Sequence, residues 1–499
     1  MLCGIRYICR GNRYFVRRFR ILCGQSSGRT AKGDIMDYTF LIVMSIYLVA
    51  MVVIGILDCR RAESFADYAV AGRRQGTLTV VMTLLATMLG ASTTIGLTDT
   101  IYSIGFPGIW WLLFGALGLV LQSVILSERV RGIGADTMPH LAEIIVGKEA
   151  SVLLALLIAI SWIGVVAGQL VAMHGLVTFA TGSSSKVLMV ILSGIVIGYT
   201  ALGGQLSVVK TDRVQIVVIL LGILLCCGYL YFSQEGAVDN ALSRTEFFNS
   251  SYDGMNLVTQ FFIIGGVYFL GPDILSRNFL SKNERTARRG AWISGLVLAG
   301  FALVITLIGI WAKNYITPEQ LGEQKTLFYV IGILPKWIGI LLSLGLLSAI
   351  LSSTDTCLIN AASIFSRDIL GKRDVKAVRW TVLGIGVLAT VIAVAGSGNI
   401  ISILTGAYSI YTPGVIFPLL IAILCYKKKG LRRKMWLSAV VLGGLFGLAG
   451  TFLSEWLAGL GLPSWFVSNL SLVGMGVSLV ISLASVQWKG TEVKENSAV

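Results

Sequence analysis

Apolar residues gather into thirteen long blocks along the chain, separated by short polar stretches. Most blocks have about the 20 residues that a helix needs to cross the hydrocarbon core of a bilayer. A segment in lipid must satisfy its own backbone hydrogen bonds, so the pattern predicts an all-α membrane protein with about 13 transmembrane helices. The blocks lie near residues 37–57, 76–104, 106–128, 151–180, 187–204, 208–232, 256–275, 290–312, 333–364, 380–396, 400–425, 435–457 and 465–487.

Basic residues are distributed unevenly between alternate loops of this arrangement. If the first helix starts outside, the inner segments carry 27 lysines and arginines and the outer segments carry 5. Because these residues are enriched in cytoplasmic loops, the C-terminus is predicted to be cytoplasmic. Because the number of helices is odd, the first helix then starts outside. The predicted location is the inner (plasma) membrane of the cell.

Residues 1–35 do not fit this orientation. They carry eight basic residues and one acid on what should be the outer side. Met36 directly precedes the first apolar block, so a translation start at Met36 would explain the misplaced charge. A basic amphipathic anchor on the membrane surface is the alternative. The segment lacks the long apolar run and A-x-A site of a signal peptide.

Composition narrows the class of protein further. Hydrophobic residues make up 55% of the 499 residues and charged residues only 13%, which leaves little sequence for a water-soluble domain. This excludes an ordinary globular enzyme, and the long blocks differ from the short alternating strands of an outer-membrane barrel. The net charge of +15 is explained by cytoplasmic loops, so the predicted partners are the lipid bilayer, an ion and a small solute rather than nucleic acid.

Two blocks contain small residues or proline at mid-membrane depth. The second reads LLATMLGASTTIGL and the seventh reads FFIIGGVYFLGPDIL. Such residues free backbone amides and carbonyls, which are tolerated only against protein or a water-filled cavity. The two blocks open consecutive groups of five, so the second group is inverted relative to the first. Paired breaks in inverted repeats indicate the binding site of a secondary transporter, whereas either break alone would also fit a kinked helix.

A division of the chain into five regions follows from this pattern. The two repeats form the centre, with one helix before them and two after them. The regions are a basic tail (1–35), the first transmembrane helix and its loop (36–75), inverted repeat 1 (76–235), inverted repeat 2 (256–426) and two C-terminal helices (435–487).

The ninth block carries adjacent hydroxyl groups. Ala349, Ser352 and Ser353 lie at i, i+3 and i+4 and therefore share one helix face. Two hydroxyls and a backbone carbonyl are hard oxygen donors for an alkali cation, and carbonyls freed near Ala86 and Leu89 would complete the shell. The alternative is that these small residues ease helix packing, with each hydroxyl bonded to a carbonyl four residues back.

Acidic residues inside the apolar blocks are candidates for contacts with ions or substrate. Asp212 lies just inside the sixth block, where a local ion pair with the basic residues beside it is the alternative role. Asp99, in the outer half of the second block, either meets a cationic substrate group or faces a wet vestibule. Asp273 and Arg277 are spaced i, i+4 and are expected to form an ion pair at a helix end.

The substrate cavity is expected between the two broken helices. Half-helix N-termini carry positive dipole ends that suit a carboxylate, and Asp99 would complement an amino group on the same molecule. A zwitterion is therefore predicted rather than a sugar. The candidate cavity residues lie at the breaks and on the fourth and eleventh blocks, and they are Gly90, Thr93, Asp99, Trp162, Gln169, Gly265 and Tyr408.

Four segments, in order along the chain, resemble one known family. SAILSSTDTCLINAASIFSRDIL resembles the signature helix of the sodium/solute symporter family, which includes sodium/proline, sodium/pantothenate and sodium/glucose symporters. ALGGQLSVVKTDRVQ resembles the family's GG-x-x-A/S-V-x-x-T-D-x-x-Q motif. ATMLGASTTIGL resembles the family's first broken helix, and GPDILSRNFLSKNERTARRG resembles the loop after the second. The resemblance extends from about residue 37 to residue 430.

The resemblance implies the leucine-transporter fold, with five-plus-five inverted repeats. It also implies that Asp212 matches the acidic residue on the family's inner exit route for sodium. Sugar-transporting members have asparagine where this chain has Met88, so an amino acid or a small organic acid is the better expectation. The implied Na+ ligands are the carbonyls of Ala86, Leu89 and Ala349 and the hydroxyls of Ser352 and Ser353.

These observations together predict sodium-coupled uptake of a small solute by alternating access, without enzyme activity. Proton coupling through Asp212 or Asp99 is the alternative mechanism. A membrane sensor that has kept the transporter fold is the alternative class, although only about 12 residues follow the last block. A channel does not explain the inverted broken helices. The substrate, its stoichiometry with sodium and the oligomeric state stay open.

Overall fold

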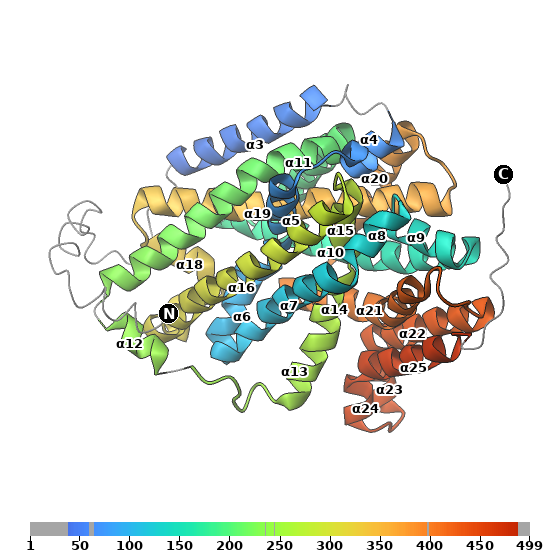
Figure 1. Cartoon of the computed structure of the whole chain (residues 1–499). Coiled ribbons are helices and arrows are strands. Elements are labelled where there is room, and N and C mark those ends of the chain that lie inside the picture. Colours follow the sequence, from blue (N-terminus) through green and yellow to red (C-terminus); the bar gives the residue numbers. More distant parts are fainter. Residues whose placement is uncertain (1–37, 59–63, 235, 244, 397–398, 488–499) are drawn as a thin grey trace.

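The computed structural model describes residues 38–58, 64–234, 236–243, 245–396 and 399–487. The expectations for residues 1–35 and for a start at Met36 lie outside this part of the chain. Within it, helices form throughout, and strand-like pairing is limited to isolated bridges such as the one between Gln75 and Ser281. The predicted all-α class is therefore confirmed (Figure 1).

Long helices form most of the molecule because the apolar blocks leave no other way to satisfy the backbone in lipid. The sequence blocks become α3 (Tyr38–Asp58), α7 (Trp110–Ile125), α10 (Lys148–Thr181), α11 (Lys186–Ser233), α16 (Glu284–Tyr315), α19 (Lys336–Ile364), α20 (Val375–Ala395), α21 (Ile400–Cys425), α22 (Arg433–Phe452) and α25 (Leu470–Ala484). Two blocks are broken, into α5 (Thr77–Met88), η2 (Ser92–Gly96) and α6 (Leu97–Ile104), and into α13 (Gly254–Gln260), η4 (Phe261–Gly265), α14 (Gly266–Leu270) and α15 (Pro272–Leu280).

Short helices occupy the loops between these spans. They are α4 (Phe65–Val70), α8 (Ser127–Ile133), α9 (Met138–Ile145), α12 (Ala237–Leu242), α17 (Pro318–Leu321), α18 (Thr326–Ile333), α23 (Ser454–Gly459) and α24 (Ser464–Ser468). Two further turns belong to spans, because η3 (Phe106–Ile109) leads into α7 and η5 (Phe365–Ile369) continues α19.

Fewer continuous spans are found than the thirteen blocks suggest. Among the described residues, ten helices are long and apolar enough to cross a membrane. This count takes the second broken segment, Gly254–Leu280, as one span and leaves out α25. The pair formed by α5 and the η2–α6 segment is bent by 61° and adds an eleventh if it is one span. The remaining difference comes from α11, which holds two predicted blocks in 48 residues, and from α25, which has only 15.

The two blocks inside α11 meet at Gly204, whose backbone is not helical (φ 63°, ψ −172°). The ring of Tyr68 packs against this glycine, and a Cβ atom there would lie 2.7 Å from the Tyr68 Cδ2 atom. The Tyr68 hydroxyl donates a hydrogen bond to the carbonyl of Ala201, 2.9 Å away. A left-handed φ and this close ring both require glycine, so the turn between the blocks is specified by sequence.

Replacing Gly204 with alanine is expected to lower the free energy of unfolding by about 1–3 kcal/mol, because a strained backbone is added to a clash with Tyr68. Thermal unfolding of the purified protein in detergent measures the change. Gly198→Ala is the matched control, since Gly198 lies in the same helix and has open space around its Cα atom. Equal melting temperatures for the two variants would contradict the role of Gly204.

Helix α19 forms the centre of the molecule and α3 lies at its edge. Of the apolar window of each helix, 78% is buried for α19 and 22% for α3, so α3 presents most of its surface to lipid. Helix α19 packs against α11 and α10, and α10 in turn packs against α21. Helices α22 and α25 pack against α21 and form a separate group in red at the lower right of Figure 1.

Candidate functional site

The first broken helix opens between Met88 and Ser92. The carbonyl of Met88 accepts a hydrogen bond from the hydroxyl of Thr93 (2.9 Å), and the carbonyl of Gly90 accepts one from the hydroxyl of Thr94 (2.8 Å) besides that of the Thr94 amide. The amide of Ala91 donates to the side-chain oxygen of Gln169 on α10, at 3.1 Å. Side chains thus replace the hydrogen bonds that the helix gives up, which makes the break stable inside the membrane.

The second broken helix opens at Gly271, whose backbone is extended (φ −66°, ψ 143°), and Pro272 then starts α15. The carbonyl of Phe269 accepts a hydrogen bond from the Gln122 side chain on α7 at 3.0 Å. The carbonyl of Leu270 accepts one from the hydroxyl of Tyr411 on α21 at 2.5 Å. Both breaks are therefore satisfied in the same manner, by polar side chains of neighbouring helices.

The predicted sodium ligands on α19 lie against the first break. The Ser352 hydroxyl donates to the carbonyl of Ala86 at 2.7 Å and to that of Ala349 at 3.2 Å. The Ser353 hydroxyl donates to the carbonyl of Thr87 at 2.8 Å. Five oxygen atoms from two helices therefore gather beside the break, as a hard cation requires.

Leu89 is the member of the predicted ligand set that takes no part in these contacts. Among the described residues, its carbonyl is joined to neither serine, and its amide donates to Leu85 within α5. The carbonyl of Thr87, which the sequence analysis did not select, takes that place beside Ser353. The break needs glycine at position 90, because a Cβ atom there would lie 2.4 Å from the Ser353 hydroxyl oxygen.

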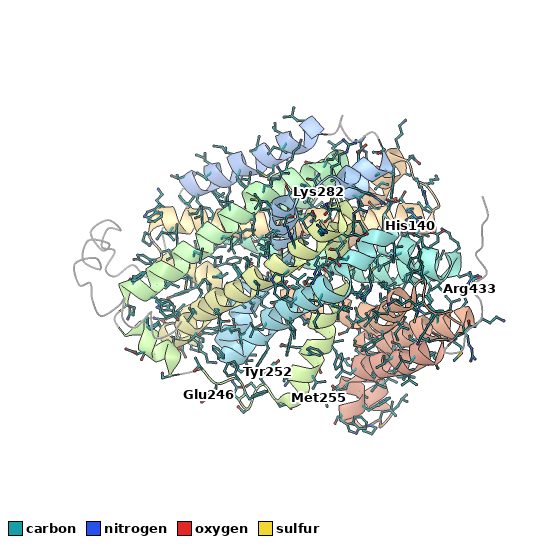
Figure 2. The ribbon with its side chains drawn as sticks, viewed as in Figure 1. His140, Glu246, Tyr252, Met255, Lys282 and Arg433 are labelled. Carbon is teal, nitrogen blue, oxygen red and sulfur yellow. The ribbon has the colours of Figure 1, made fainter. Side chains whose placement is uncertain are left out.

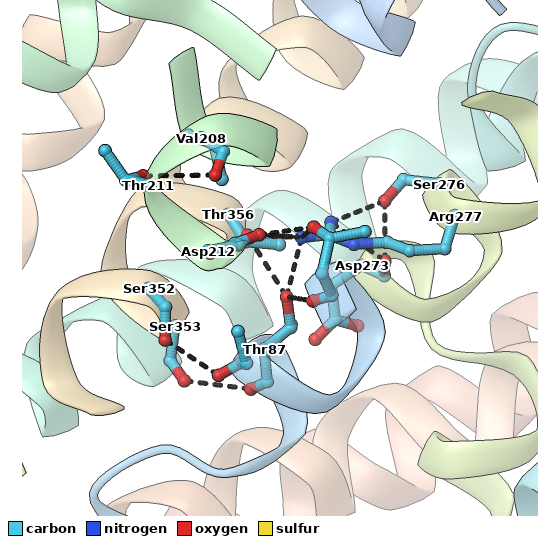
Figure 3. Close-up of polar contacts among 12 residues, drawn as sticks. Thr87, Val208, Thr211, Asp212, Asp273, Ser276, Arg277, Ser352, Ser353 and Thr356 are labelled. Atoms are coloured by element: carbon cyan, nitrogen blue, oxygen red, sulfur yellow. Dashed lines mark hydrogen bonds and ion pairs between the residues drawn. The ribbon is translucent and has the colours of Figure 1, made fainter. Parts of the chain in front are cut away.

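A buried polar cluster lies next to these oxygen atoms. The side chains of Asp212 on α11 and Arg277 on α15 are both fully buried, and an Arg277 nitrogen lies 3.5 Å from a carboxylate oxygen of Asp212. The same nitrogen donates to the hydroxyls of Thr87 and Thr356, each at 2.6 Å. The hydroxyl of Thr83 donates to the Asp212 carboxylate. Figure 3 shows the Arg277 side chain reaching from α15 toward Asp212.

This cluster differs from the local ion pairs that the sequence suggests. Arg277 approaches Asp273 through the backbone carbonyl (3.3 Å), while its guanidinium is directed at Asp212, 65 positions away in sequence. Asp212 in turn has Arg277 as its ion partner rather than a basic residue beside it on α11. The cluster joins four helices, α5, α11, α15 and α19.

A narrow cavity lies between the two breaks. Its free interior holds about one water molecule and is far smaller than the roughly 300–1,000 Å³ typical of small-molecule sites, so it must widen to admit a solute. Of the seven predicted cavity residues, Gly90, Gln169 and Tyr408 line it. The proposed sodium ligand Ser353 also lines it, so the cation cluster and the cavity share a wall. The other lining residues are Thr87, Met88, Ser92, Val165, Val267, Tyr268, Asp273, Ile274 and Cys357.

Four predicted residues lie elsewhere. Asp99 binds Lys325 (3.1 Å) and the amide of Thr326 (2.8 Å), which ties α6 to α18. Thr93 is buried, and its hydroxyl donates a hydrogen bond to the backbone carbonyl of Met88 at the break. The Trp162 ring packs behind the cavity against Tyr408 and Tyr411, and Gly265 faces Phe114 on α7.

Comparison with known proteins finds similar transporters. The High-affinity proline transporter PutP of Bacillus subtilis is 24% identical over 387 residues, covering 72% of this chain and 81% of the relative. High-affinity choline transporter 1 of Drosophila melanogaster is 25% identical over 425 residues, covering 77% of this chain and 66% of the relative. A solved Na+-coupled sialic acid symporter, in a substrate-bound outward-open state, superposes with a TM-score of 0.73 at 16% identity, covering 92% of this chain and all of that one.

The similar proteins are transporters rather than enzymes, and the structural similarity establishes the leucine-transporter type of fold. The sequence model of the sodium:solute symporter family matches residues 68–431. These residues include the broken helices, the serine pair on α19 and the Asp212–Arg277 cluster. The family expected from the four motifs is thereby confirmed, and the chain belongs to the sodium:solute symporter family.

Proposed function

We propose that this protein couples inward movement of sodium to uptake of a small organic solute, most suitably an amino acid. The observation that carries the proposal is the position of Ser353. Its hydroxyl belongs to the oxygen cluster of α5 and α19, and its side chain also lines the cavity. A cation bound by this cluster would therefore contact the wall of the solute site.

Sodium would act by holding the first broken helix against α19. The Ser352 and Ser353 hydroxyls now donate to carbonyls of α5, and a cation would bring both kinds of oxygen together as ligands. An ion that favours this arrangement shifts the population toward the state with an ordered cavity. By reciprocity, bound solute then raises the affinity for sodium, which is the coupling that symport needs.

The ion pairs of Asp212 and Asp99, the two acids considered as proton carriers, favour coupling to sodium rather than to protons. Asp212 is paired with the fully buried Arg277, and Asp99 is paired with Lys325 and bonded to an amide. Protonating either carboxyl would leave a cation without its partner, which is costly where the pair is buried. The neutral oxygen cluster beside the break involves no such loss.

We also propose thirteen spans with two inverted repeats of five. Helices α5 to α11, with α11 divided at Gly204, would form the first repeat. Helices α13 to α21 would form the second, with α3 before them and α22 and α25 after them. The positions of the two breaks, each in the first helix of its group and each closed by side chains of other helices, support this assignment.

The orientation proposed from basic residues agrees with the arrangement of the loops. Figure 2 shows His140, Lys282 and Arg433 toward the upper right, and Glu246, Tyr252 and Met255 at the lower edge. We assign the first group to the cytoplasmic side of the plasma membrane, because the basic loops before α16 and α22 lie there. The chain would then begin its first helix outside and end in the cytoplasm.

Uptake into proteoliposomes tests the proposal. Purified protein is given an inward sodium gradient and labelled amino acids, choline, organic acids or glucose, and potassium replaces sodium in the control. We expect accumulation of a solute only with the sodium gradient. Accumulation driven by a proton gradient without sodium would instead support proton coupling, and no accumulation of any solute would contradict transport.

A further inference from the structure

Asp273 is the acidic residue that lines the cavity. It is the second residue of α15 and follows directly after the Gly271–Pro272 break. Its Oδ1 atom is buried and accepts no hydrogen bond of normal geometry from any residue that the structure describes. Its Oδ2 atom lies 4.0 Å from the sulfur of Cys357, which is a weak donor. The carboxylate is therefore placed at the cavity wall with unused hydrogen-bonding capacity.

The nearest cation does not neutralise this carboxylate through an ion pair. Arg277 follows one helical turn later, but its guanidinium donates to the backbone carbonyl of Asp273 and otherwise contacts Asp212, Thr87 and Thr356. In the described part of the chain, no lysine or arginine nitrogen pairs with the Asp273 carboxylate within 4.0 Å. A half-buried carboxylate such as that of Asp273 has lost part of its hydration and is stabilised when a cation joins it.

The rest of the cavity suits an organic cation. Tyr268 and Tyr408 present aromatic rings to it, and Val165, Val267 and Ile274 supply apolar surface. Aromatic faces attract ammonium groups, and this attraction strengthens when water is excluded. Gln169 lies beside Gly90 and offers an amide to a polar group elsewhere on the solute.

We propose that Asp273 binds a positively charged nitrogen of the transported solute. The substrate class is then an amino acid or an amine, and an organic acid without an amino group or a neutral sugar is excluded. This inference rests on the proposed function of the cavity as the solute site. It gives Asp273 the role that the sequence analysis considered for Asp99, which the structure instead joins to α18.

Sodium itself is the competing occupant of this carboxylate. The oxygen cluster at Ser352 and Ser353 is a separate location for the ion, so the two roles can be distinguished by experiment. If Asp273 binds solute nitrogen, changing it should alter solute affinity and leave sodium affinity in place. If it binds sodium, the reverse is expected.

Paired solutes that differ in a positively charged nitrogen test the inference on the unaltered protein. L-Proline is compared with tetrahydrofuran-2-carboxylate, in which oxygen replaces the ring ammonium, and choline with 3,3-dimethylbutan-1-ol, in which carbon replaces the quaternary nitrogen. We expect sodium-driven uptake of labelled proline or choline, inhibited at least about tenfold more strongly by the parent than by the partner that lacks the cationic nitrogen. Equal inhibition by both members of a pair would overturn the inference.

The uptake panel separates this inference from the proposed function. Sodium-driven uptake of pyruvate or glucose alone would support symport and overturn the role of Asp273. The absence of sodium-driven uptake of every solute would overturn both. Sodium-driven uptake of a solute with a cationic nitrogen, with weaker inhibition by the partner that lacks this nitrogen, supports both.

Asp273→Asn removes the charge and keeps the shape. We expect the KM for the cationic solute to rise at least about tenfold, while the sodium concentration for half-maximal uptake, measured at a saturating solute concentration for each variant, changes by less than about twofold. Glu455→Gln is the control, because Glu455 is an exposed acid on α23, far in sequence from the breaks. An unchanged KM, or a shift in sodium dependence alone, would overturn the inference. If Asp273→Asn does not fold, the paired solutes still decide the question.

Discussion

Replacing Arg277 with methionine is expected to lower the free energy of unfolding by about 3–5 kcal/mol, enough to prevent recovery of folded protein from many membrane preparations. The reason is the carboxylate of Asp212, which is fully buried and has Arg277 as its ion partner. Methionine keeps much of the volume of the arginine stem but leaves the acid without a cation. It also removes the donor that joins Thr87 to Thr356 across α5 and α19.

Thermal unfolding in detergent, followed by size-exclusion chromatography, measures this loss. Arg288→Met is the matched control, because Arg288 forms an exposed pair with Glu128 at 3.3 Å. Such surface pairs contribute about 0–1 kcal/mol, so this control should melt close to the unaltered protein. Adding Asp212→Asn to Arg277→Met should restore part of the loss, since it removes the uncompensated charge. Similar melting temperatures for Arg277→Met and Arg288→Met would show that the buried pair is not needed for stability.

Replacing both Ser352 and Ser353 with alanine is expected to weaken the apparent sodium affinity of uptake at least about tenfold, or about 1.4 kcal/mol. The two hydroxyls donate the hydrogen bonds that join α19 to the carbonyls of Ala86 and Thr87. Each lost oxygen ligand should cost about 1 kcal/mol or more, since hydrogen-bonding groups contribute roughly that amount. Sodium titration of solute uptake in proteoliposomes measures the effect.

Ser343→Ala is the control for a general effect of losing a buried hydroxyl. Ser343 lies on the same helix, is fully buried and donates to the carbonyl of Gly339 at 2.8 Å. Its loss should leave sodium dependence unchanged because Ser343 is more than two helical turns from Ser352 and Ser353. A double serine variant that inserts normally and keeps its sodium dependence would place the ion elsewhere.

The approximate positions of the helices and of their breaks could be predicted from the sequence. A bilayer requires long apolar runs, and glycine or proline inside such a run can be located by inspection, as at Gly90 and Gly271. The serine pair on α19 could be found because i, i+3 and i+4 positions share a helix face. These features depend on residues that are close together in the chain.

Partners that are distant in sequence could not be found in this way. The i, i+4 spacing favoured an ion pair between Asp273 and Arg277, yet the guanidinium binds Asp212 on another helix. Because Asp273 was assigned to this ion pair, it was not predicted to line the cavity. Thr93 was predicted to line the cavity because it lies at the first break, but its hydroxyl instead donates to the backbone carbonyls of Met88 and Gly90. The contact of Asp99 with the start of α18 could not be predicted, because α18 follows more than 200 residues later in the sequence.

The attachment of α18 to α6 has a consequence for measurement of the transport cycle. Asp99 holds Lys325 and the Thr326 amide, so opening at the proposed outer end must either carry α18 along with α6 or separate these groups. The Lys325 side chain is 35% exposed, so dissolved salt screens its attraction to Asp99. External ionic strength should therefore alter the rate of opening independently of sodium, and sodium titrations need an inert salt that keeps total ionic strength constant.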